Sequence, residues 1–313
     1  MRYGVAVAQQ LRASGHEVML TTRKHPDTVA LSKLLGERFR VVGKYSPSSP
    51  QSRLKESLKR QLTFCEMFES EPPDYAVSHG SIDLCRVAFG LGVLTISTAD
   101  APHATAANKL ALPLVDVLIT SNAIPQQEYE RFGVKKIVQF NGVDEVAWVR
   151  DYKPKPTEYK KPLIVVRQME TMASYANGKR DATEQIAHKL VSLGNVMFIP
   201  RYDRRLRSGL IVPQEFVDSV SLSADADLLV SVGGTISREA ALQGTPSIVI
   251  RTFGTSYVNN YLSELGFPLF TVELNQVFKL AEKYINQKWN VEEQLKQLEN
   301  PVDYIGKIIR KKL

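Results

Sequence analysis

Short apolar stretches alternate with longer amphipathic stretches along almost the whole chain of 313 residues. The apolar stretches have the length of strands, and the amphipathic stretches carry apolar residues at helical spacing. This alternation is typical of a parallel sheet covered on both faces, with right-handed crossover connections. The expected strands are 17–22, 40–42, 75–78, 93–97, 117–120, 137–140, 163–167, 195–200, 227–232, 247–251 and 269–272. The expected helices are 28–35, 52–68, 82–91, 104–113, 125–132, 180–193, 213–221, 235–243, 256–265 and 274–287.

One segment interrupts this alternation. Residues 151–162 (DYKPKPTEYKKP) hold three prolines, four lysines and little apolar content, which is typical of an interdomain linker. The length of the chain suits two domains of about 150 residues each. We therefore expect an α/β protein with two doubly wound Rossmann-like domains, at 1–150 and 163–313, and a ligand in the cleft between them.

The chain opens in a helical pattern, with Val5, Ala8 and Leu11 on one stripe. A doubly wound domain normally opens with a strand that lies in the middle of its sheet. We therefore expect the first domain to lack its first strand. A misassigned start, a truncated gene and a true variant are all open explanations.

Composition excludes several classes of protein. A content of 43% hydrophobic and 23% charged residues indicates a packed globular chain. The sequence has no apolar run of about 18 residues that could span a membrane, and its N-terminus lacks a signal-peptide pattern. The two cysteines, Cys65 and Cys85, are too few for a disulfide framework, which favours buried thiols in a reducing cytoplasm.

The chain carries a net charge of +7, which favours an anionic partner. The densest basic group lies at the C-terminus, in Lys307, Arg310, Lys311 and Lys312. It fits a solvated helix end, and the alternative is peripheral contact with an acidic membrane surface. We do not expect a nucleic-acid partner, because no zinc-finger or RNA-binding aromatic motif is present.

The strongest local motif is the string SVGGTISREAALQGTP at 231–246. An expected strand ends just before Gly233-Gly234, and an expected helix follows from Thr235, which can cap it. Amides at such a helix start bind phosphate or diphosphate. Glu239 lies one turn further along the same helix face, where a carboxylate can bind both hydroxyls of a ribose.

Two further motifs follow strands of the first domain. His79 and Gly80 come directly after 75–78, at the sheet edge where ligands of this fold class bind. Asp100 and His103 follow 93–97 and are candidates for general acid and base catalysis. The alternatives are a helix cap at His79 and an ordinary turn at Asp100. The other candidates in this domain are Ser81, Asn108, Lys109 and Asn141.

Two arginines at expected strand ends of the second domain, Arg167 and Arg201, could pair with phosphate or form structural ion pairs. His79 and His103 have no carboxylate-rich or cysteine-rich set at metal-ligand spacing beside them, so we expect no metal. The nucleotide-sugar-binding residues that we expect are Gly233, Gly234, Thr235, Arg238, Glu239, Arg167 and Arg201.

The glycine string resembles the nucleotide-binding segment of GT-B glycosyltransferases and of non-hydrolysing UDP-N-acetylglucosamine 2-epimerases. The chain as a whole is more similar to a prokaryotic family in that superfamily, the domain of unknown function 354, often labelled a predicted glycosyltransferase. The segments that carry this similarity are GHEVMLTTR (15–23), DYAVSHGS (74–81), CRVAFGLG (85–92), DAPHATAANKLALPLVDVLIT (100–120), NGVDE (141–145), PRYD (200–203) and GGTISREAALQGTP (233–246).

The resemblance implies a GT-B-like fold and a UDP-sugar substrate, with Glu239 on the ribose and Gly233, Gly234 and Thr235 on phosphate. It implies no cofactor beyond that substrate. The chain departs from the epimerases, which carry Gly-Asp-Thr at the position of Gly80-Ser81-Ile82, Glu-Ala at Asp100-Ala101 and Asn-Arg at Asn108-Lys109. These departures argue against a simple transfer of epimerase activity.

Three hypotheses follow. The first is a metal-independent glycosyltransferase that uses a UDP-sugar and an unknown acceptor, with His79, Asp100 and His103 as its catalytic residues. The second is a 2-epimerase-like isomerase, which needs a pair of carboxylates beside the reacting carbon. The third is a non-catalytic or inactive binding protein. The sugar, the base, the acceptor and the oligomeric state are open at this level.

Overall fold

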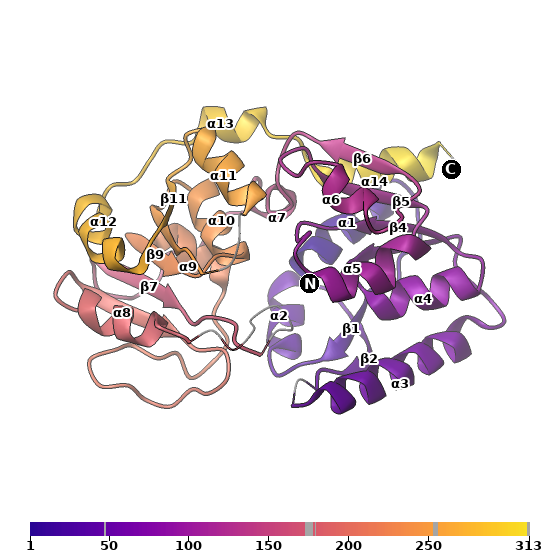
Figure 1. Ribbon diagram of the computed structural model, residues 1–313, viewed down its shortest axis with the longest axis horizontal. Coiled ribbons are helices and arrows are strands. Elements are labelled where there is room, and N and C mark those ends of the chain that lie inside the picture. Colours follow the sequence, from indigo (N-terminus) through magenta and orange to yellow (C-terminus); the bar gives the residue numbers. More distant parts are fainter. Residues whose placement is uncertain (47, 173–177, 179, 253–255, 312–313) are drawn as a thin grey trace. The chain divides into compact units, whose positions relative to one another are not determined.

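The computed structural model describes residues 1–46, 48–172, 178, 180–252 and 256–311 (Figure 1). The chain divides into two compact units. Unit 1 comprises Met1–Ala147 and Glu299–Leu313, and unit 2 comprises Trp148–Leu298. The division lies close to the predicted domain end at residue 150. The prediction of one domain over 163–313 differs from this division, because the residues from Glu299 onward pack in unit 1.

Every strand pairing in unit 1 is parallel, as predicted. In the described residues the strands form two separate sheets, β1-β2 and β3-β4-β5-β6. The strands are β1 (Thr21–Lys24), β2 (Arg40–Lys44), β3 (Tyr75–His79), β4 (Leu94–Thr98), β5 (Val117–Ser121) and β6 (Ile137–Phe140).

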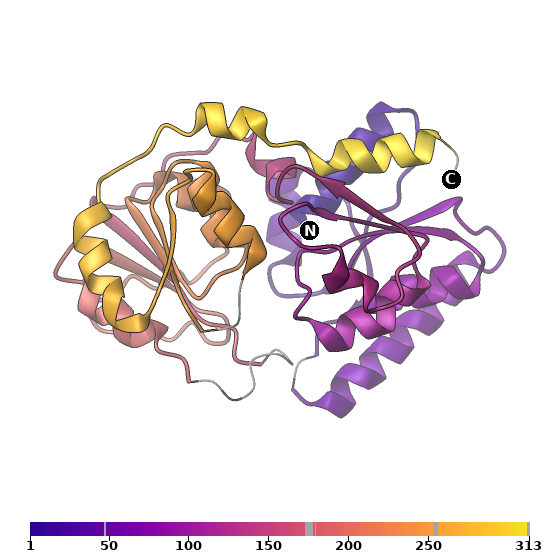
Figure 2. The same ribbon diagram turned by 45° about the horizontal axis from the view of Figure 1, so that its top comes forward.

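The helices of unit 1 include both ends of the chain. The first, α1, buries Val5, Ala8 and Leu11 on one face, as predicted. The last, α14, contacts α1 and β5, and Figure 2 shows it along unit 1. The helices are α1 (Arg2–Ala13), α2 (Thr28–Leu35), α3 (Pro50–Phe68), α4 (Ile82–Gly90), α5 (Thr105–Ala111), η1 (Leu112–Leu114), α6 (Gln127–Glu130), α7 (Val146–Val149), which spans the boundary, and α14 (Pro301–Arg310).

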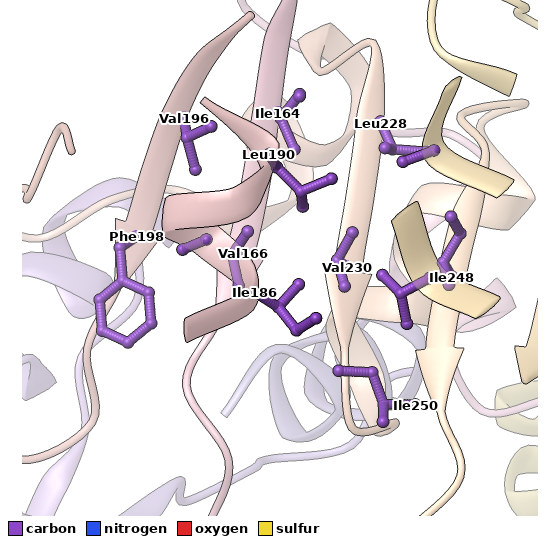
Figure 3. Close-up of a cluster of buried hydrophobic side chains, with 13 residues drawn as sticks. Ile164, Val166, Ile186, Leu190, Val196, Phe198, Leu228, Val230, Ile248 and Ile250 are labelled. Atoms are coloured by element: carbon purple, nitrogen blue, oxygen red, sulfur yellow. The ribbon is translucent and has the colours of Figure 1, made fainter. Parts of the chain in front are cut away.

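Unit 2 contains one parallel five-stranded sheet in the order β11-β10-β9-β7-β8. Its strands are buried on both faces, because Ile164 and Val166 point into one apolar cluster and Leu163 and Val165 into another. Figure 3 shows the first cluster. The strands are β7 (Leu163–Arg167), β8 (Asn195–Ile199), β9 (Leu228–Ser231), β10 (Ser247–Ile250) and β11 (Leu269–Val272).

Helices cover both faces of this sheet. Helices α8 and α12 contribute to the first cluster, and α9 and α10 contribute to the second. The predicted α/β fold with parallel sheets is therefore confirmed. The helices are α8 (Thr183–Leu190), α9 (Ser219–Asp225), α10 (Thr235–Leu242), α11 (Tyr257–Glu264), η2 (Leu274–Gln276), α12 (Val277–Tyr284) and α13 (Glu292–Gln297).

Two expectations for unit 2 need correction. The segment predicted as a linker packs along α9, where the Tyr152 hydroxyl donates to Asp218 at 2.5 Å and the Lys155 amide donates to Ser221 at 3.0 Å. The helix predicted at 213–221 begins only at Ser219, because Asp218 caps it by accepting from the amide of Val220.

None of the described helices is both long enough and apolar enough to cross a membrane. Lys312, part of the predicted basic group, lies outside the described residues.

Candidate functional site

One imidazole in unit 1 lies between two carboxylates. His79, Asp100 and Asp144 each offer a donor atom, and these three atoms lie within 4.8 Å of one another. The Nε2 atom of His79 is 4.0 Å from Asp100 Oδ1, and its Nδ1 atom is 3.8 Å from Asp144 Oδ2. The His79 side chain is 47% exposed, whereas that of Asp144 is 7% exposed. A ligand from solvent can therefore reach the imidazole.

Backbone geometry places this cluster at the carboxyl ends of the strands. His79 is the last residue of β3, and Gly80 follows it at a φ of +60°, a value that favours glycine. Asp100 lies two residues after β4 and Asp144 lies four residues after β6. This edge is where α/β sheets bind ligands.

Two hydroxyl-bearing residues hold the imidazole in place. Thr98 Oγ1 lies 2.7 Å from His79 Nδ1, and the Tyr3 ring meets the imidazole edge to face at 5.3 Å. Burial raises the pKa of Tyr3 well above its ordinary value, and the negative charge of Asp144 raises it further. Tyr3 therefore keeps its proton beside the cluster at neutral pH.

The loop that carries Asp100 is fixed by Asn108 of α5. The Asn108 amide donates to the carbonyls of Ala101 at 3.0 Å and Pro102 at 3.3 Å, and its side chain is buried. Asn108 therefore orients the loop. His103 in the same loop is exposed and lies outside the group of donor atoms formed by His79 and its two carboxylates.

The other candidates of unit 1 are Ser81, Lys109 and Asn141, and two of them form hydrogen bonds within the unit. The amide of Leu84 donates to Ser81 Oγ, so Ser81 caps α4 and the alternative of a His79 cap is excluded. Lys109 is exposed on α5. The Asn141 amide donates to Glu299 Oε2 at 2.6 Å, and its side-chain oxygen accepts from Asn122.

Asp144 is a functional candidate that the sequence alone did not single out. The NGVDE segment follows an expected strand, so an acid at that sheet edge was the available signal. With Asp144 in place, an exposed imidazole has two carboxylates beside it, which suits proton transfer. A nitrogen donor and two carboxylates in this arrangement could also hold a divalent cation.

In unit 2, the glycine turn after β9 is open. Gly233 and Gly234 have φ values of +103° and +97°, which favour glycine, and a side chain at Gly234 would meet no atom within 4 Å. Ser231 Oγ accepts from the Gly233 amide at 2.9 Å and lies against Ser237 Oγ. The Ser231 hydroxyl thus holds one side of the turn, whereas Gly234 is exposed.

Helix α10 begins directly after this turn. Its cap position is Gly234, and no side chain caps it among the residues described. The expectation that Thr235 caps the helix is therefore wrong, because Thr235 is the first helical residue and is exposed. The Ser237 amide donates to the Gly234 carbonyl at 3.2 Å. Ahead of it, a helix start without a side-chain cap presents backbone amides and a positive partial charge, which suit an anion.

Glu239 lies one turn into α10 and is 1% exposed. Its Oε1 atom accepts a hydrogen bond of 2.9 Å from the indole of Trp148, a residue that sequence reasoning did not single out. The preceding residue, Arg238, is buried as well. A ribose that binds Glu239 must therefore share or displace the Trp148 contact.

The two arginines at strand ends of unit 2 have partners within the unit. Arg167 donates to the carbonyl of Pro200 at 3.0 Å. Arg201 donates to the carbonyl of Gln168 at 2.9 Å and pairs with Glu170 at 3.5 Å. Both side chains stabilise the strand-end loops, and a phosphate would have to compete with these contacts.

Solved structures with the same fold include nucleotide-sugar enzymes. The UDP-GlcNAc 2-epimerase of Methanocaldococcus jannaschii, solved with UDP-GlcNAc and UDP, is 13% identical with a TM-score of 0.69, over 99% of this chain and 96% of its own. The Neisseria meningitidis UDP-GlcNAc 2-epimerase, bound to UDP-GlcNAc, is 15% identical with a TM-score of 0.65, over 99% and 98%.

The glycosyltransferase SsfS6 of Streptomyces sp. SF2575, solved with thymidine diphosphate, is 17% identical with a TM-score of 0.59, over 98% and 95% of the two chains. Together these similarities show a GT-B-like fold.

Sequence comparison gives a family. An uncharacterized protein of Methanocaldococcus jannaschii is 28% identical over 321 residues, which cover 97% of this chain and 92% of that protein. The model of the family described as "Protein of unknown function (DUF354)" matches residues 1–313. The chain therefore belongs to the DUF354 family.

Proposed function

We propose that this protein is a nucleotide-sugar-dependent glycosyltransferase of the GT-B type. The observation that carries the proposal is the uncapped start of α10, behind two glycines at positive φ, with Glu239 one turn further along. The similar fold of enzymes solved with UDP-GlcNAc, UDP or thymidine diphosphate supports a nucleoside diphosphate as the ligand.

In this proposal, unit 2 holds the nucleotide. The diphosphate accepts hydrogen bonds from the amides at the start of α10, whose dipole offsets its negative charge without a metal ion. Glu239 accepts hydrogen bonds from the ribose hydroxyls, and Trp148 orients that carboxylate. Arg238, Arg167 and Arg201 remain candidate contributors of positive charge.

Unit 1 supplies the proton acceptor. The oxygen of an acceptor hydroxyl attacks the anomeric carbon, and the bond from that carbon to the diphosphate oxygen breaks. The hydroxyl proton passes to His79, and the nucleoside diphosphate departs with the electron pair. Asp100 and Asp144 stabilise the imidazolium that forms, because their carboxylates lie 4.0 Å and 3.8 Å from its nitrogens. His103, exposed in the Asp100 loop, is a candidate contact for the acceptor.

A radiolabelled UDP-sugar panel with pooled acceptors tests this function. We expect sugar transfer that survives chelation of divalent metals, and a loss of roughly 100- to 10,000-fold in kcat for His79→Asn and Asp144→Asn. His188→Asn is the matched control, because His188 is exposed on α8, outside the cluster. Transfer that is equal in all three variants would reject the proposed role of the cluster.

A 2-epimerase acting on UDP-N-acetylglucosamine is the second candidate. The observation in its favour is Asp144, because epimerisation needs a pair of groups to remove and return a proton beside the anomeric carbon. Incubation in heavy water separates the two reactions. Deuterium at C2 without an acceptor identifies an epimerase, whereas transfer that requires an acceptor, without deuterium at C2, identifies a transferase.

A further inference from the structure

Helix α3 of unit 1 exposes a row of leucines. Leu54, Leu58 and Leu62 are 62%, 57% and 61% exposed. Their spacing of four residues places them in one stripe along the helix. Cys65 continues the stripe and is also exposed, contrary to the expectation of two buried thiols. Contiguous exposed apolar side chains of this kind mark an interaction surface.

The opposite face of α3 is anchored in unit 1, so the stripe is not a consequence of a loosely packed helix. Phe64 is fully buried against Val42 and Val87. Arg60 is buried, donates to the carbonyl of Val42 at 2.7 Å and pairs with Asp83 of α4 at 3.5 Å. Figures 1 and 2 show α3 alongside α4 at the edge of unit 1.

Charges are segregated along the exposed side of this helix. Its N-terminal half carries the exposed cations Arg53, Lys55 and Lys59 and one half-buried acid, Glu56, which pairs with Lys59 at 3.2 Å. The exposed residues from position 66 to position 71 include Glu66, Glu69 and Glu71 and no cation. The leucine stripe therefore has a basic end and an acidic end.

We propose that the α3 stripe docks onto the same stripe of a second copy of this chain, with the two helices antiparallel. An antiparallel arrangement places the basic end of each helix against the acidic end of the other. A two-fold axis perpendicular to both helices brings the same flank of each stripe together. Lys59 and Glu66 lie on one flank, about 10 Å apart along the helix at 1.5 Å per residue. Pairing each Lys59 with Glu66 of the second copy sets the two-fold axis level with Leu62 and leaves Leu54 beyond the end of the second helix at Phe68. In this register Lys59 exchanges its contact with Glu56, at 3.2 Å on the same helix, for Glu66 of the second copy.

Alternative occupants fit less well. A parallel pair would place like charges at the same level along the stripe. An acidic membrane surface would attract the basic end and repel the acidic end that carries Glu66 and Glu69. A single helix pair is small beside the roughly 1,200–2,000 Å² of a typical stable interface, so we expect a dimer that dissociates in the micromolar range.

Sedimentation velocity from low to high micromolar concentration tests the surface. The chain should shift from monomer to dimer, and Leu58→Glu should remain a monomer throughout. Leu110→Glu is the matched control, because Leu110 of α5 is 58% exposed and lies outside the stripe, and it should dimerise like the unaltered chain. A monomer at every concentration, or a dimer that survives Leu58→Glu with its circular dichroism unchanged, would overturn the proposal.

A charge swap tests the antiparallel register. Lys59→Glu and Glu66→Lys should each raise the dissociation constant about tenfold, because each places two like-charge contacts in the symmetric dimer. The double variant should return to within about threefold of the original value. Single variants without effect, or a double variant weaker than either, would reject this register. Binding of the monomer to phosphatidylserine vesicles that Leu58→Glu abolishes would assign the stripe to a membrane instead.

Discussion

At the scale of single residues, the contact between Trp148 and Glu239 links the proposed ribose site to a spectroscopic probe. The chain has two tryptophans, Trp148 and Trp289, so Trp289→Phe leaves Trp148 as the source of indole emission. A ribose that hydrogen-bonds to Glu239 changes the polarity beside the Trp148 indole, which donates to that carboxylate at 2.9 Å. We predict a saturable change in emission when the Trp289→Phe variant is titrated with UDP.

The same titration on a Trp148→Phe, Trp289→Phe variant supplies the background signal. If the Trp148 emission stays constant while calorimetry shows that UDP binds, the nucleotide does not contact Glu239.

Part of the cluster around His79 was predictable from the sequence. His79 and Asp100 stand directly after expected strands, and strand ends of a parallel sheet share one edge, so their proximity was predictable. Asp144 follows a third strand, but nothing in a single sequence indicates which acid in NGVDE turns toward His79. Trp148 was not predictable either, because its contact with Glu239 joins positions 91 residues apart.

At the scale of elements, the Glu299 carboxylate links the start of α14 to the residue that follows β6. Glu299 Oε2 accepts from the Asn141 amide at 2.6 Å and from the Tyr304 hydroxyl at 2.8 Å. These hydrogen bonds lower the pKa of the Glu299 carboxyl below its ordinary value, and the bond from the Asn141 amide has the larger effect. A lowered folded-state pKa adds stability above the unfolded value of about 4.3, and this stability is lost as the pH falls through the folded value.

We therefore predict that Glu299→Gln lowers the free energy of unfolding of unit 1 at pH 7 by up to about 1 kcal/mol, the range of exposed ionic contacts. The difference from the unaltered chain should shrink as the pH falls below the unfolded value of about 4.3 toward the lowered folded value. Urea unfolding followed by circular dichroism at both pH values measures it. Glu282→Gln, exposed on α12 in unit 2, is the control. An equal difference in the free energy of unfolding at pH 7 and at pH 3.5 would contradict this role of the Glu299 carboxylate.

The elements themselves were mostly predictable, with informative exceptions. Strands at 137–140, 163–167 and 269–272 have the expected bounds. The clearest case is 163–167, where the apolar run from Leu163 to Val166 is buried in the sheet. The segment 151–162 reads as a linker by composition, yet Tyr152 and Lys155 find hydrogen-bond partners on α9. The composition of a segment shows that it has few apolar side chains to bury. It does not show which polar groups of the protein form hydrogen bonds with that segment.

At the scale of the whole molecule, the two-unit organisation and the parallel sheets followed from the alternation of strands and helices. The return of the C-terminus to unit 1 did not. The amphipathic pattern of α14 shows that one of its faces is buried, but not that the partner is α1, almost 300 positions earlier in the chain. A contact of that sequence separation leaves no local signal.

The central claim is that a nucleoside diphosphate binds at the start of α10. Gly234→Ala and Gly209→Ala form a matched pair, because both glycines have positive φ, +97° and +73°, and open space at the added carbon, but only Gly234 precedes α10. Calorimetric titration with UDP should give the same affinity for the unaltered chain and Gly209→Ala, and an affinity at least tenfold weaker for Gly234→Ala. Equal affinities for both variants, or no binding of UDP or thymidine diphosphate by the unaltered chain, would contradict the account.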